Sequence, residues 1–440
     1  MRMPFALLWL VAAAAAAYGG PRAPYEVVRD HAAISVESDG SFTETREETY
    51  LALDAAGVRL LRERKLFYSR GFETLTVVAA ATLKADGRRL DIPAAAIVTD
   101  KGQSLPRGGF LDVSIVSLGY PDLAPGDKVL LTTRLTQTKP WFSGRFDVRA
   151  VFSRTVAAHD TVYTLDAPAG MKLFIDAKGL FGGKPEEMAG RKTWSWAFEN
   201  AAPTPLEADA VSEADFAPHL SISSYADYAE VAAAFRGAAS GRAAVTPEIQ
   251  ALAAGLTAGA TRPRDKARIL YDWVAGHTAY IAIELGSGGF TPRSAQQVLD
   301  TGFGDCKDHA VLLEAMLKAV GIESSSALIA SGINTYRLPV IATPHAFDHV
   351  VTYIPAFGLF LDSSASFAPF GVLPYADADK PALLVKSGEV MHTPMPDSST
   401  SVIRTDGTVT VNPDGSASGR VEITASGAYG VDVRALFGSL

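Results

Sequence analysis

Cys306 is the only cysteine among 440 residues, and it stands in the run Gly304-Asp305-Cys306-Lys307-Asp308. Buried cysteines are ordinarily quiet apolar residues, but charged neighbours on both sides favour a reactive one. Cys306 is therefore predicted in the first turn of a helix, where free N–H groups and the helix dipole favour a thiolate nucleophile. The helix is indicated by an apolar stripe and a glycine stop: Leu312, Leu313, Met316, Leu317, Val320 and Gly321.

A cysteine nucleophile needs a base to hold its proton and a third group to orient that base. The β-branched run His349–Ile354, the turn-like run 355–358 and the apolar run Leu359–Asp362 together predict a β-hairpin. A turn centred near Pro355-Ala356 would place His349 directly opposite Asp362, with their Cβ atoms about 4.5–5.5 Å apart. The carboxylate could then hold an imidazole N–H.

Three other polar side chains surround these positions in the sequence. Asp348 neighbours His349 on the strand and should point to the opposite face, so Asp362 is the better third member. His309 follows Cys306 by three residues and is interpreted as a solvated first-turn histidine; it could neighbour the sulfur but is poorly placed as a base. Asp305 and Asp308 suit a helix start, although they would oppose thiolate formation.

An acyl-transfer site also needs donors for an oxyanion. The backbone N–H of Cys306 is a suitable first donor, because helix N-termini present free N–H groups. The second donor is expected from a side chain upstream, and four residues are available: Tyr280, Gln296, Gln297 and Trp273. Tyr280 is favoured, whereas Trp273 extends an apolar helix stripe.

Together these segments resemble the transglutaminase-like superfamily, whose fold is related to papain-like cysteine proteases. More narrowly, the chain is similar to bacterial secreted proteins that join such a core to an N-terminal β-rich domain of unknown function. The likeness covers roughly residues 245–390, and the N-terminal region more loosely. The chain departs from these relatives at His309, where they usually carry a basic residue, and they continue beyond residue 440. The matching stretches are Tyr280–Gly286, Gly289–Pro292, Gly304–Asp308, Phe347–Val350 and Leu361–Asp362.

The resemblance implies that Cys306 is the nucleophile, His349 the general base and acid, and Asp362 the orienting carboxylate. The expected reaction is acyl transfer from an amide of a peptide or protein, through a thioester, to an amine or to water. The resemblance implies no cofactor. The alternative function is a non-catalytic periplasmic module for binding or assembly, with the transglutaminase-like core as a scaffold.

The N-terminus is typical of a secretory signal peptide over residues 1–20, with Arg2 ahead of an apolar run from Phe5 to Ala17. The run is shorter than the ~20 apolar residues that span a membrane. An uncleaved anchor is the alternative interpretation. No later segment reaches spanning length, so no integral membrane segment is expected after removal of the signal. The bacterial resemblance then favours the periplasm.

Composition and missing motifs narrow the classes of partner. The formal net charge of −8 without a basic block argues against nucleic acid. Phosphate-loop, dinucleotide, EF-hand, CxxC and HExxH patterns are absent from the sequence, so no cofactor or metal site is predicted. His345 and His349 are four residues apart but flank a strand start, which makes them a poor metal pair.

The predicted fold class is multi-domain. Residues 24–205 are expected to form an all-β sandwich or open barrel, with hairpin turns at Asp39-Gly40 and Asp86-Gly87. Residues 206–243 are interpreted as a linker, and 244–392 as an α+β transglutaminase-like core in which Thr246-Pro247 begins a helix. Residues 398–440 are expected to begin a C-terminal β domain. The oligomeric state is left open.

Overall fold

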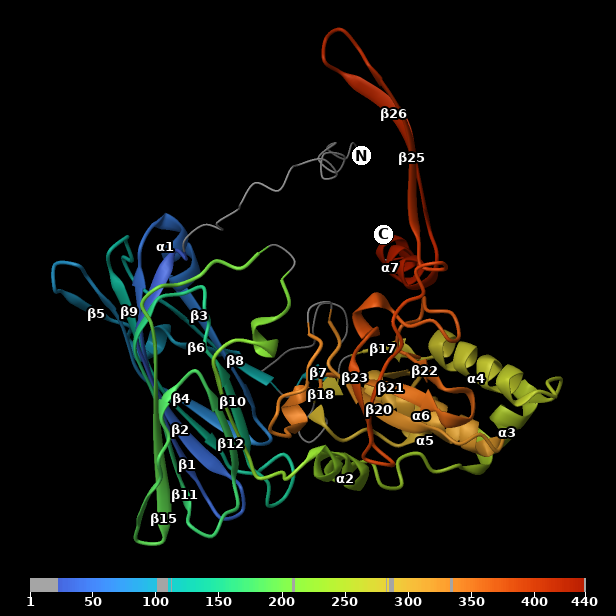
Figure 1. Ribbon diagram of the computed structural model, residues 1–440, viewed down its shortest axis with the longest axis horizontal. Helices are drawn as coiled ribbons and strands as arrows, with labels where there is room; N and C mark the ends of the chain where they lie inside the picture. The colour runs from blue at the N-terminus through green and yellow to red at the C-terminus, as the bar shows by residue number, and fades with distance from the viewer. Residues whose placement is uncertain are drawn as a thin grey trace.

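A computed structural model of the protein describes residues 23–100, 110–111, 113–207, 210–281, 283–284, 289–332 and 335–438. Figure 1 shows a β-rich N-terminal region beside a core of mixed helices and strands, from which a long C-terminal hairpin projects. The prediction of a multi-domain chain with this order of elements is confirmed. The predicted signal peptide lies outside the described residues.

A nine-stranded sheet forms most of the N-terminal region. Its strand order is β13-β15-β11-β1-β2-β9-β4-β5, with β14 paired to β15, and β1 runs parallel to β11. Both predicted hairpin turns are confirmed, because Gly40 and Gly87 adopt a φ of 91° that disfavours other residues. The strands are β1 (Tyr25–Val36), β2 (Phe42–Ala52), β4 (Glu73–Leu83), β5 (Arg89–Asp91), β9 (Lys128–Gln137), β11 (Ala158–Pro168), β13 (Phe181–Gly182), β14 (Glu186–Met188) and β15 (Arg191–Asn200).

Two three-stranded sheets pack against this large sheet through apolar cores. Ile34 and Trp196 of the large sheet lie against Ile222, and Leu131 lies in a second core with Leu118. These elements are β10 (Asp147–Val151), β16 (His219–Ser223) and β12 (Phe174–Lys178) in one sheet, and β3 (Glu63–Ser69), β8 (Val113–Gly119) and β6 (Val98–Asp100) in the other, with α1 (Ala55–Leu61), η1 (Ala94–Ala96) and η2 (Glu213–Asp215) between strands.

The interval 206–243 contains more than a connection. β16 lies in it and is the central strand of one three-stranded sheet, and α2 (Tyr228–Ala238) follows. Val231 of α2 is fully buried in a cluster with residues of the core. This interval therefore fixes the core against the N-terminal region.

The core is an antiparallel five-stranded sheet with helices packed on it. The predicted start at Thr246-Pro247 is confirmed, since Thr246 caps α3 by accepting the N–H of Ile249. Leu312, Met316 and neighbouring apolar side chains of α6 are fully buried among the other helices. In sheet order the strands are β22 (Leu359–Leu361), β21 (His349–Ile354), β20 (Ser325–Ile329), β23 (Pro381–Leu384) and β24 (Val390–His392), and the helices are α3 (Pro247–Thr257), α4 (Pro263–His277), α5 (Ala295–Thr301) and α6 (Cys306–Ala319).

Short elements connect the two regions and shape the loops. β7 (Phe110–Leu111) of the N-terminal region pairs with β18 (Ile283–Glu284) of the core, and β17 (Ala279–Tyr280) pairs with β19 (Phe303–Gly304). The remaining short elements are the 3₁₀ turns η4 (Pro344–Ala346), η5 (Pro355–Phe357) and η6 (Tyr375–Asp377).

The register of the predicted His349–Asp362 hairpin was wrong by two residues. β21 and β22 pair antiparallel, but Thr352 lies opposite Leu361, so Asp362 is not directly opposite His349. The connection between the two strands is one 3₁₀ turn, η5, and it ends at Gly358, whose φ is 60°. An even shift leaves the two side chains on one face, and they meet diagonally across the strands.

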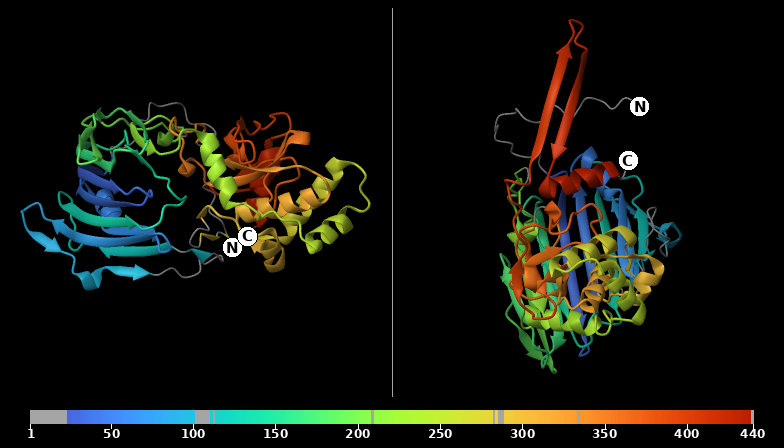
Figure 2. Two further views of the ribbon diagram at one scale, coloured as in Figure 1. Left: turned by 90° about the horizontal axis from the view of Figure 1, so that it is seen from below. Right: turned by 90° about the vertical axis from the view of Figure 1, so that its right-hand side faces the viewer.

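The C-terminal segment forms a hairpin and then a helix. β25 (Ile403–Val411) pairs with β26 (Ala417–Ala425), which confirms the expected strands. A helix that was not predicted, α7 (Gly427–Gly438), follows and lies at the base of the hairpin. Figure 1 and the right-hand view of Figure 2 show the hairpin extending away from the core.

Among the described helices, none combines the length and the apolar character needed to cross a membrane.

Candidate active site

Cys306 is the first residue of α6, as predicted. Asp305 is the N-cap, and its side chain accepts the N–H of Asp308 at 3.2 Å. Gly304 lets the chain approach the helix closely, because a Cβ there would lie 2.6 Å from the Cβ of Asp308. The thiol is partly exposed on the wall of a cleft. The loop-to-helix junction therefore presents the sulfur to solvent and substrate.

Basic residues balance the two carboxylates that flank Cys306. Arg293 donates to Asp308 from its backbone N–H and from Nε, each at 2.8 Å, and Asp308 is buried. Lys307 forms an ion pair with Asp305. Burial raises the pKa of Asp305 above its usual value, against the opposing effect of Lys307. These ion pairs therefore largely offset the repulsion that Asp305 and Asp308 would exert on a Cys306 thiolate.

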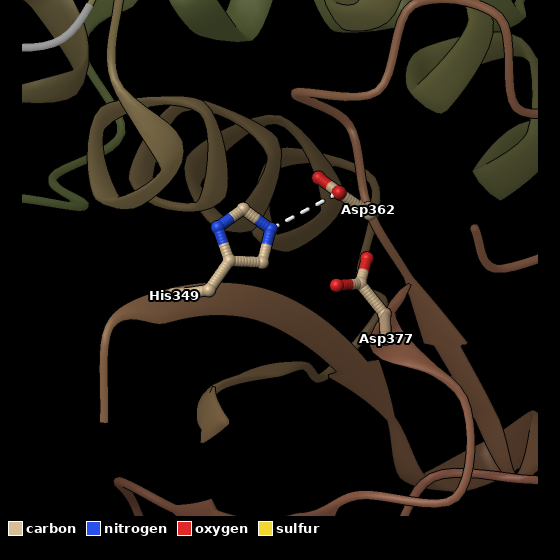
Figure 3. Close-up of side chains that lie close together, drawn as sticks. All are labelled: His349, Asp362 and Asp377. Atoms are coloured by element: carbon tan, nitrogen blue, oxygen red, sulfur yellow. Dashed lines mark hydrogen bonds and ion pairs between the residues drawn. The ribbon is translucent and has the colours of Figure 1, made fainter. Parts of the chain in front are cut away.

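The structure brings Cys306, His349 and Asp362 together. His349 Nε2 lies 3.0 Å from Asp362 Oδ2, and His349 and Cys306 line the same cleft, close enough for the sulfur to affect the pKa of the imidazole. Figure 3 shows the imidazole on β21 with Nε2 directed at Asp362 and Nδ1 on the other side of the ring. Because a carboxylate only accepts, Nε2 must carry a proton, which leaves Nδ1 to exchange one with the sulfur.

The local charges favour an imidazolium beside a carboxylate. Burial by itself would lower the pKa of His349, but hydrogen bonds and charge from Asp362 and Cys306 raise it well above 6.5. Burial would raise the pKa of Asp362, but the hydrogen bond and charge of His349 and other donors lower it to about 2. Asp362 is therefore an acceptor that retains its charge at neutral pH.

Hydrogen bonds from a neighbouring serine and from a distant tyrosine hold the Asp362 segment in place. Ser364 donates to Asp362 Oδ1 from its backbone N–H at 2.9 Å and from its hydroxyl at 2.6 Å. The hydroxyl of Tyr271 in α4 donates to the Asp362 carbonyl at 3.0 Å and to the Ala368 carbonyl at 2.9 Å. Tyr271 is fully buried on the apolar stripe of α4, so its sequence position predicts only core packing and not this hydrogen bond.

The interpretation of His309 as a solvated residue was wrong. The structure buries it to 1% exposure, where its Nδ1–H donates to the Ser363 carbonyl at 2.9 Å. Burial lowers the pKa of His309, which keeps the ring neutral. It does not line the cleft. The helix that carries Cys306 is therefore tied through His309 to the segment that carries Asp362.

Of the four proposed oxyanion side chains, Tyr280 alone lines the cleft beside Cys306. Its ring lies near that of His309, with 6.3 Å between centroids. Gln296 bonds Thr246, Glu248 and Asp300, and Gln297 closes the capping box of α5. Trp273 packs against the helical core, as the sequence indicated.

Both regions of the chain form the cleft beside Cys306, which has a volume of about 390 Å³. Trp141 of the N-terminal region packs against Phe290 of the core, with 5.4 Å between ring centroids. At its rim His345 Nδ1 lies 2.7 Å from Asp147 Oδ2, so this histidine bonds the N-terminal region. Apolar side chains line much of the cleft: Trp141, Phe235, Phe290, Val311, Leu328, Phe347, Val350 and Val385.

Asp377 lies beside His349 and Asp362, although no sequence pattern selects it. One ligand atom from each of the three residues lies within 4.8 Å of the others, so the group has the composition to hold a metal ion. Asp348, by contrast, accepts the N–H of Ser331 at 2.7 Å through its side chain and does not join His349.

Comparisons with known proteins agree with this architecture. Residues 38–205 match the family described as a domain of unknown function with a solved structure, DUF3857, and residues 250–330 match the transglutaminase-like superfamily. A search of curated proteins gives no match.

A solved structure shares the arrangement of both regions. A crystal structure described as a "putative protease" from Parabacteroides distasonis has a TM-score of 0.70 at 19% identity, over 85% of this chain and 72% of that one. A zinc metallopeptidase of the M1 class from Deinococcus radiodurans matches at a TM-score of 0.24 and 14% identity, over 46% of this chain and 42% of that one, which is too weak to support an inference. The chain therefore carries a DUF3857 domain over residues 38–205 and a transglutaminase-like segment over residues 250–330, in the order of the two regions of the fold.

Proposed function

We propose that the protein is a cysteine-dependent acyltransferase or amidohydrolase that acts on amide bonds of peptides or proteins. The observation that carries this proposal is one imidazole, His349, that is hydrogen-bonded to Asp362 and lines the same open cleft as Cys306. A nucleophile, its base and the group that orients the base are the parts that covalent acyl transfer requires.

In the proposed first half-reaction, Cys306 Sγ attacks the amide carbonyl carbon, and His349 holds the thiol proton. Collapse of the tetrahedral intermediate breaks the C–N bond, and His349 delivers that proton to the departing amine. A thioester on Cys306 remains. In the second half, His349 takes a proton from an amine or a water as it attacks the thioester carbonyl, and Cys306 leaves as the thiolate.

Two donors are available to stabilise the oxyanion of each tetrahedral intermediate. The backbone N–H of Cys306 belongs to the first turn of α6, where N–H groups have no partner within the helix. Tyr280 lines the same cleft and is about half exposed, so its hydroxyl is our candidate for the second donor. Both donors would act where charge develops, which lowers the barrier without tightening substrate binding.

The cleft supports a peptide or protein substrate. Its walls are aromatic and aliphatic, and its mouth is open to solvent, so an extended chain could lay one large apolar side chain into it. The net charge of −8 supports neither nucleic acid nor an anionic lipid surface as a partner.

A chemical test that needs no substrate separates this proposal from a non-catalytic binding module. We expect iodoacetamide to alkylate Cys306 rapidly at about pH 6.5 in the wild-type protein, because the proposed base His349 can take the thiol proton. His349→Ala should slow that reaction about 10- to 100-fold at the same pH. The rates are measured by mass spectrometry of the intact protein.

His392→Ala is the matched control for this alkylation test, since it removes an exposed histidine that does not line the cleft. It should alkylate at the wild-type rate. Equally slow alkylation in wild type and His349→Ala would favour the binding or assembly module.

We also propose that the protein is exported to the periplasm through its N-terminal segment. Arg2 and the apolar run that follows support this. When the full chain is expressed in a Gram-negative host, the mature protein should lack roughly its first 20 residues. N-terminal sequencing of the periplasmic fraction checks this. Recovery of the intact N-terminus in the cytoplasm would contradict export.

A further inference from the structure

Asp377 is a buried carboxyl behind the proposed catalytic group. It ends the 3₁₀ turn η6, on a different segment from His349 and Asp362, and its residue exposure is only 2%. Figure 3 shows its side chain pointing into the space beside the imidazole, with one oxygen toward Asp362. The three side chains each place a ligand atom within 4.8 Å of the others. Two buried carboxyls therefore share one small volume with a single imidazole.

The hydrogen bonds of Asp377 are incomplete for a carboxylate. Oδ1 accepts from the Ser331 hydroxyl at 2.7 Å. Oδ2 is buried and has no donor within hydrogen-bonding distance in the part of the chain that the structure describes. Asp377 and Asp362 are in side-chain hydrogen-bonding contact, although two ionised carboxylates would both be acceptors. A proton on Asp377 turns this unfavourable contact into an O–H···O⁻ hydrogen bond.

The charged groups around Asp377 do not offer it an ion pair. A ring nitrogen of His349 lies within 4.8 Å of an Asp377 oxygen, but His349 Nε2 is already bonded to Asp362. Lys380 acts on Asp377 only through its field, because its Nζ donates to the Thr335 carbonyl at 2.7 Å and lies 4.0 Å from the centroid of the Tyr336 ring. Burial and the negative charge of Asp362 raise the pKa of Asp377 to about 7.

We propose that Asp377 is protonated at mildly acidic pH and donates a hydrogen bond to Asp362, and that this bond positions the carboxylate behind His349. The proton satisfies the unpaired oxygen and removes the repulsion between the two carboxyls. It also adds a donor to Asp362, which keeps Asp362 an acceptor for the imidazole N–H. Asp377 is thus a positioning residue that acts through Asp362. This role rests on the proposed function, whereas the protonation itself does not.

The conservative variant distinguishes a protonated carboxyl from an ionised one. Asp377→Asn replaces the acid O–H with an amide N–H, so it should keep wild-type kcat/KM at about pH 6. Asp377→Ala removes the donor and should lower kcat/KM about 10- to 100-fold. As the pH rises through about 7, wild type should lose activity in a step that Asp377→Asn lacks, because ionised Asp377 repels Asp362. A similar loss in both variants at pH 6 would overturn the proposal.

Two further measurements do not depend on catalysis. A protonated-carboxyl carbonyl band should appear in the infrared difference spectrum of wild type minus Asp377→Asn at about pH 6, and should vanish above about pH 8. The free energy of unfolding should fall between about pH 4 and 7 more steeply in wild type than in Asp377→Asn, because the folded state there binds the extra proton. Asp379→Asn, an exposed neighbour, is the control for both.

A metal ion is the competing occupant of this group. Purified protein treated with EDTA would then titrate with zinc in a calorimeter, and Asp377→Asn would weaken that binding. Such binding, together with no carboxyl band in the metal-free protein, would overturn the proposal. If the carboxyl band is present but Cys306 shows no activation toward iodoacetamide, the protonation stands and the proposed function fails.

Discussion

Cys306→Ala is expected to abolish both amide hydrolysis and amine transfer, with a loss on the order of 10⁴-fold or more in kcat. No other sulfur in the chain can replace the nucleophile, since the sequence contains one cysteine. The measurement is substrate profiling with peptide libraries and with glutamine and amine donors, followed by mass spectrometry. Products joined to the amine indicate transamidation, and free acids indicate hydrolysis.

Cys306→Ser is the matched variant for this experiment, because a hydroxyl fills nearly the same space but is a poorer nucleophile at neutral pH. The kcat of this variant should also fall by several orders of magnitude, and no thioester should form on it. Wild type should prefer peptides that carry a large apolar side chain near the scissile amide, given the walls of the cleft. Activity that survives in Cys306→Ala would mean that this sulfur is not the nucleophile.

The helix that carries Cys306 could be predicted because its signals are local. Asp305 supplies the cap, the apolar stripe begins at Leu312, and Gly321 ends the helix with a φ of 77°. The strand that begins at His349 was equally visible in its β-branched run. For this strand, only the predicted register with β22 was wrong. The alternation of apolar and polar residues does not specify how many residues the connecting 3₁₀ turn contains.

The residues that support the site could not be predicted, because their partners lie far along the chain. Tyr271 precedes the Asp362 carbonyl that it bonds by 91 residues, and His309 precedes the Ser363 carbonyl by 54. Each looks like an ordinary helix residue in sequence. Asp377 follows a loop with no alternation and comes near Asp362 only once the sheet is formed. These contacts depend on tertiary packing, which periodicity does not report.

The N-terminal region contributes directly to the cleft, which gives it a role beyond that of an attached domain. Phe72 stacks on Trp141 with 4.5 Å between ring centroids, and Trp141 then contacts Phe290 of the core. The pair of Asp147 with His345 and the pairing of β7 with β18 join the same two regions. We infer that a change in the packing of these regions would alter the wall of the cleft without touching Cys306.

Asp362→Asn should lower kcat/KM on the order of 10³- to 10⁴-fold, the scale seen when the orienting carboxylate of a serine triad is replaced. Asparagine can present an N–H₂ to His349 Nε2, which would favour the wrong tautomer and leave Nδ1 protonated when it should accept from the thiol. Asp379→Asn, an exposed carboxyl two residues after Asp377, is the control and should keep full activity. Full activity of Asp362→Asn would contradict the orienting role.

The same variant has a pH signature with a definite sign. In wild type the pKa of His349 is raised, so its contribution to the free energy of unfolding is fully present below about pH 6.5 and is lost as the pH rises through the folded pKa. Without the charge of Asp362, burial should dominate and lower that pKa. Asp362→Asn should therefore lose the decline in stability above pH 6.5, and alkylation of Cys306 at about pH 6.5 should slow. Urea unfolding at a series of pH values, together with NMR titration of the His349 ring, measures both effects, and an unchanged His349 titration would refute the electrostatic role assigned to Asp362.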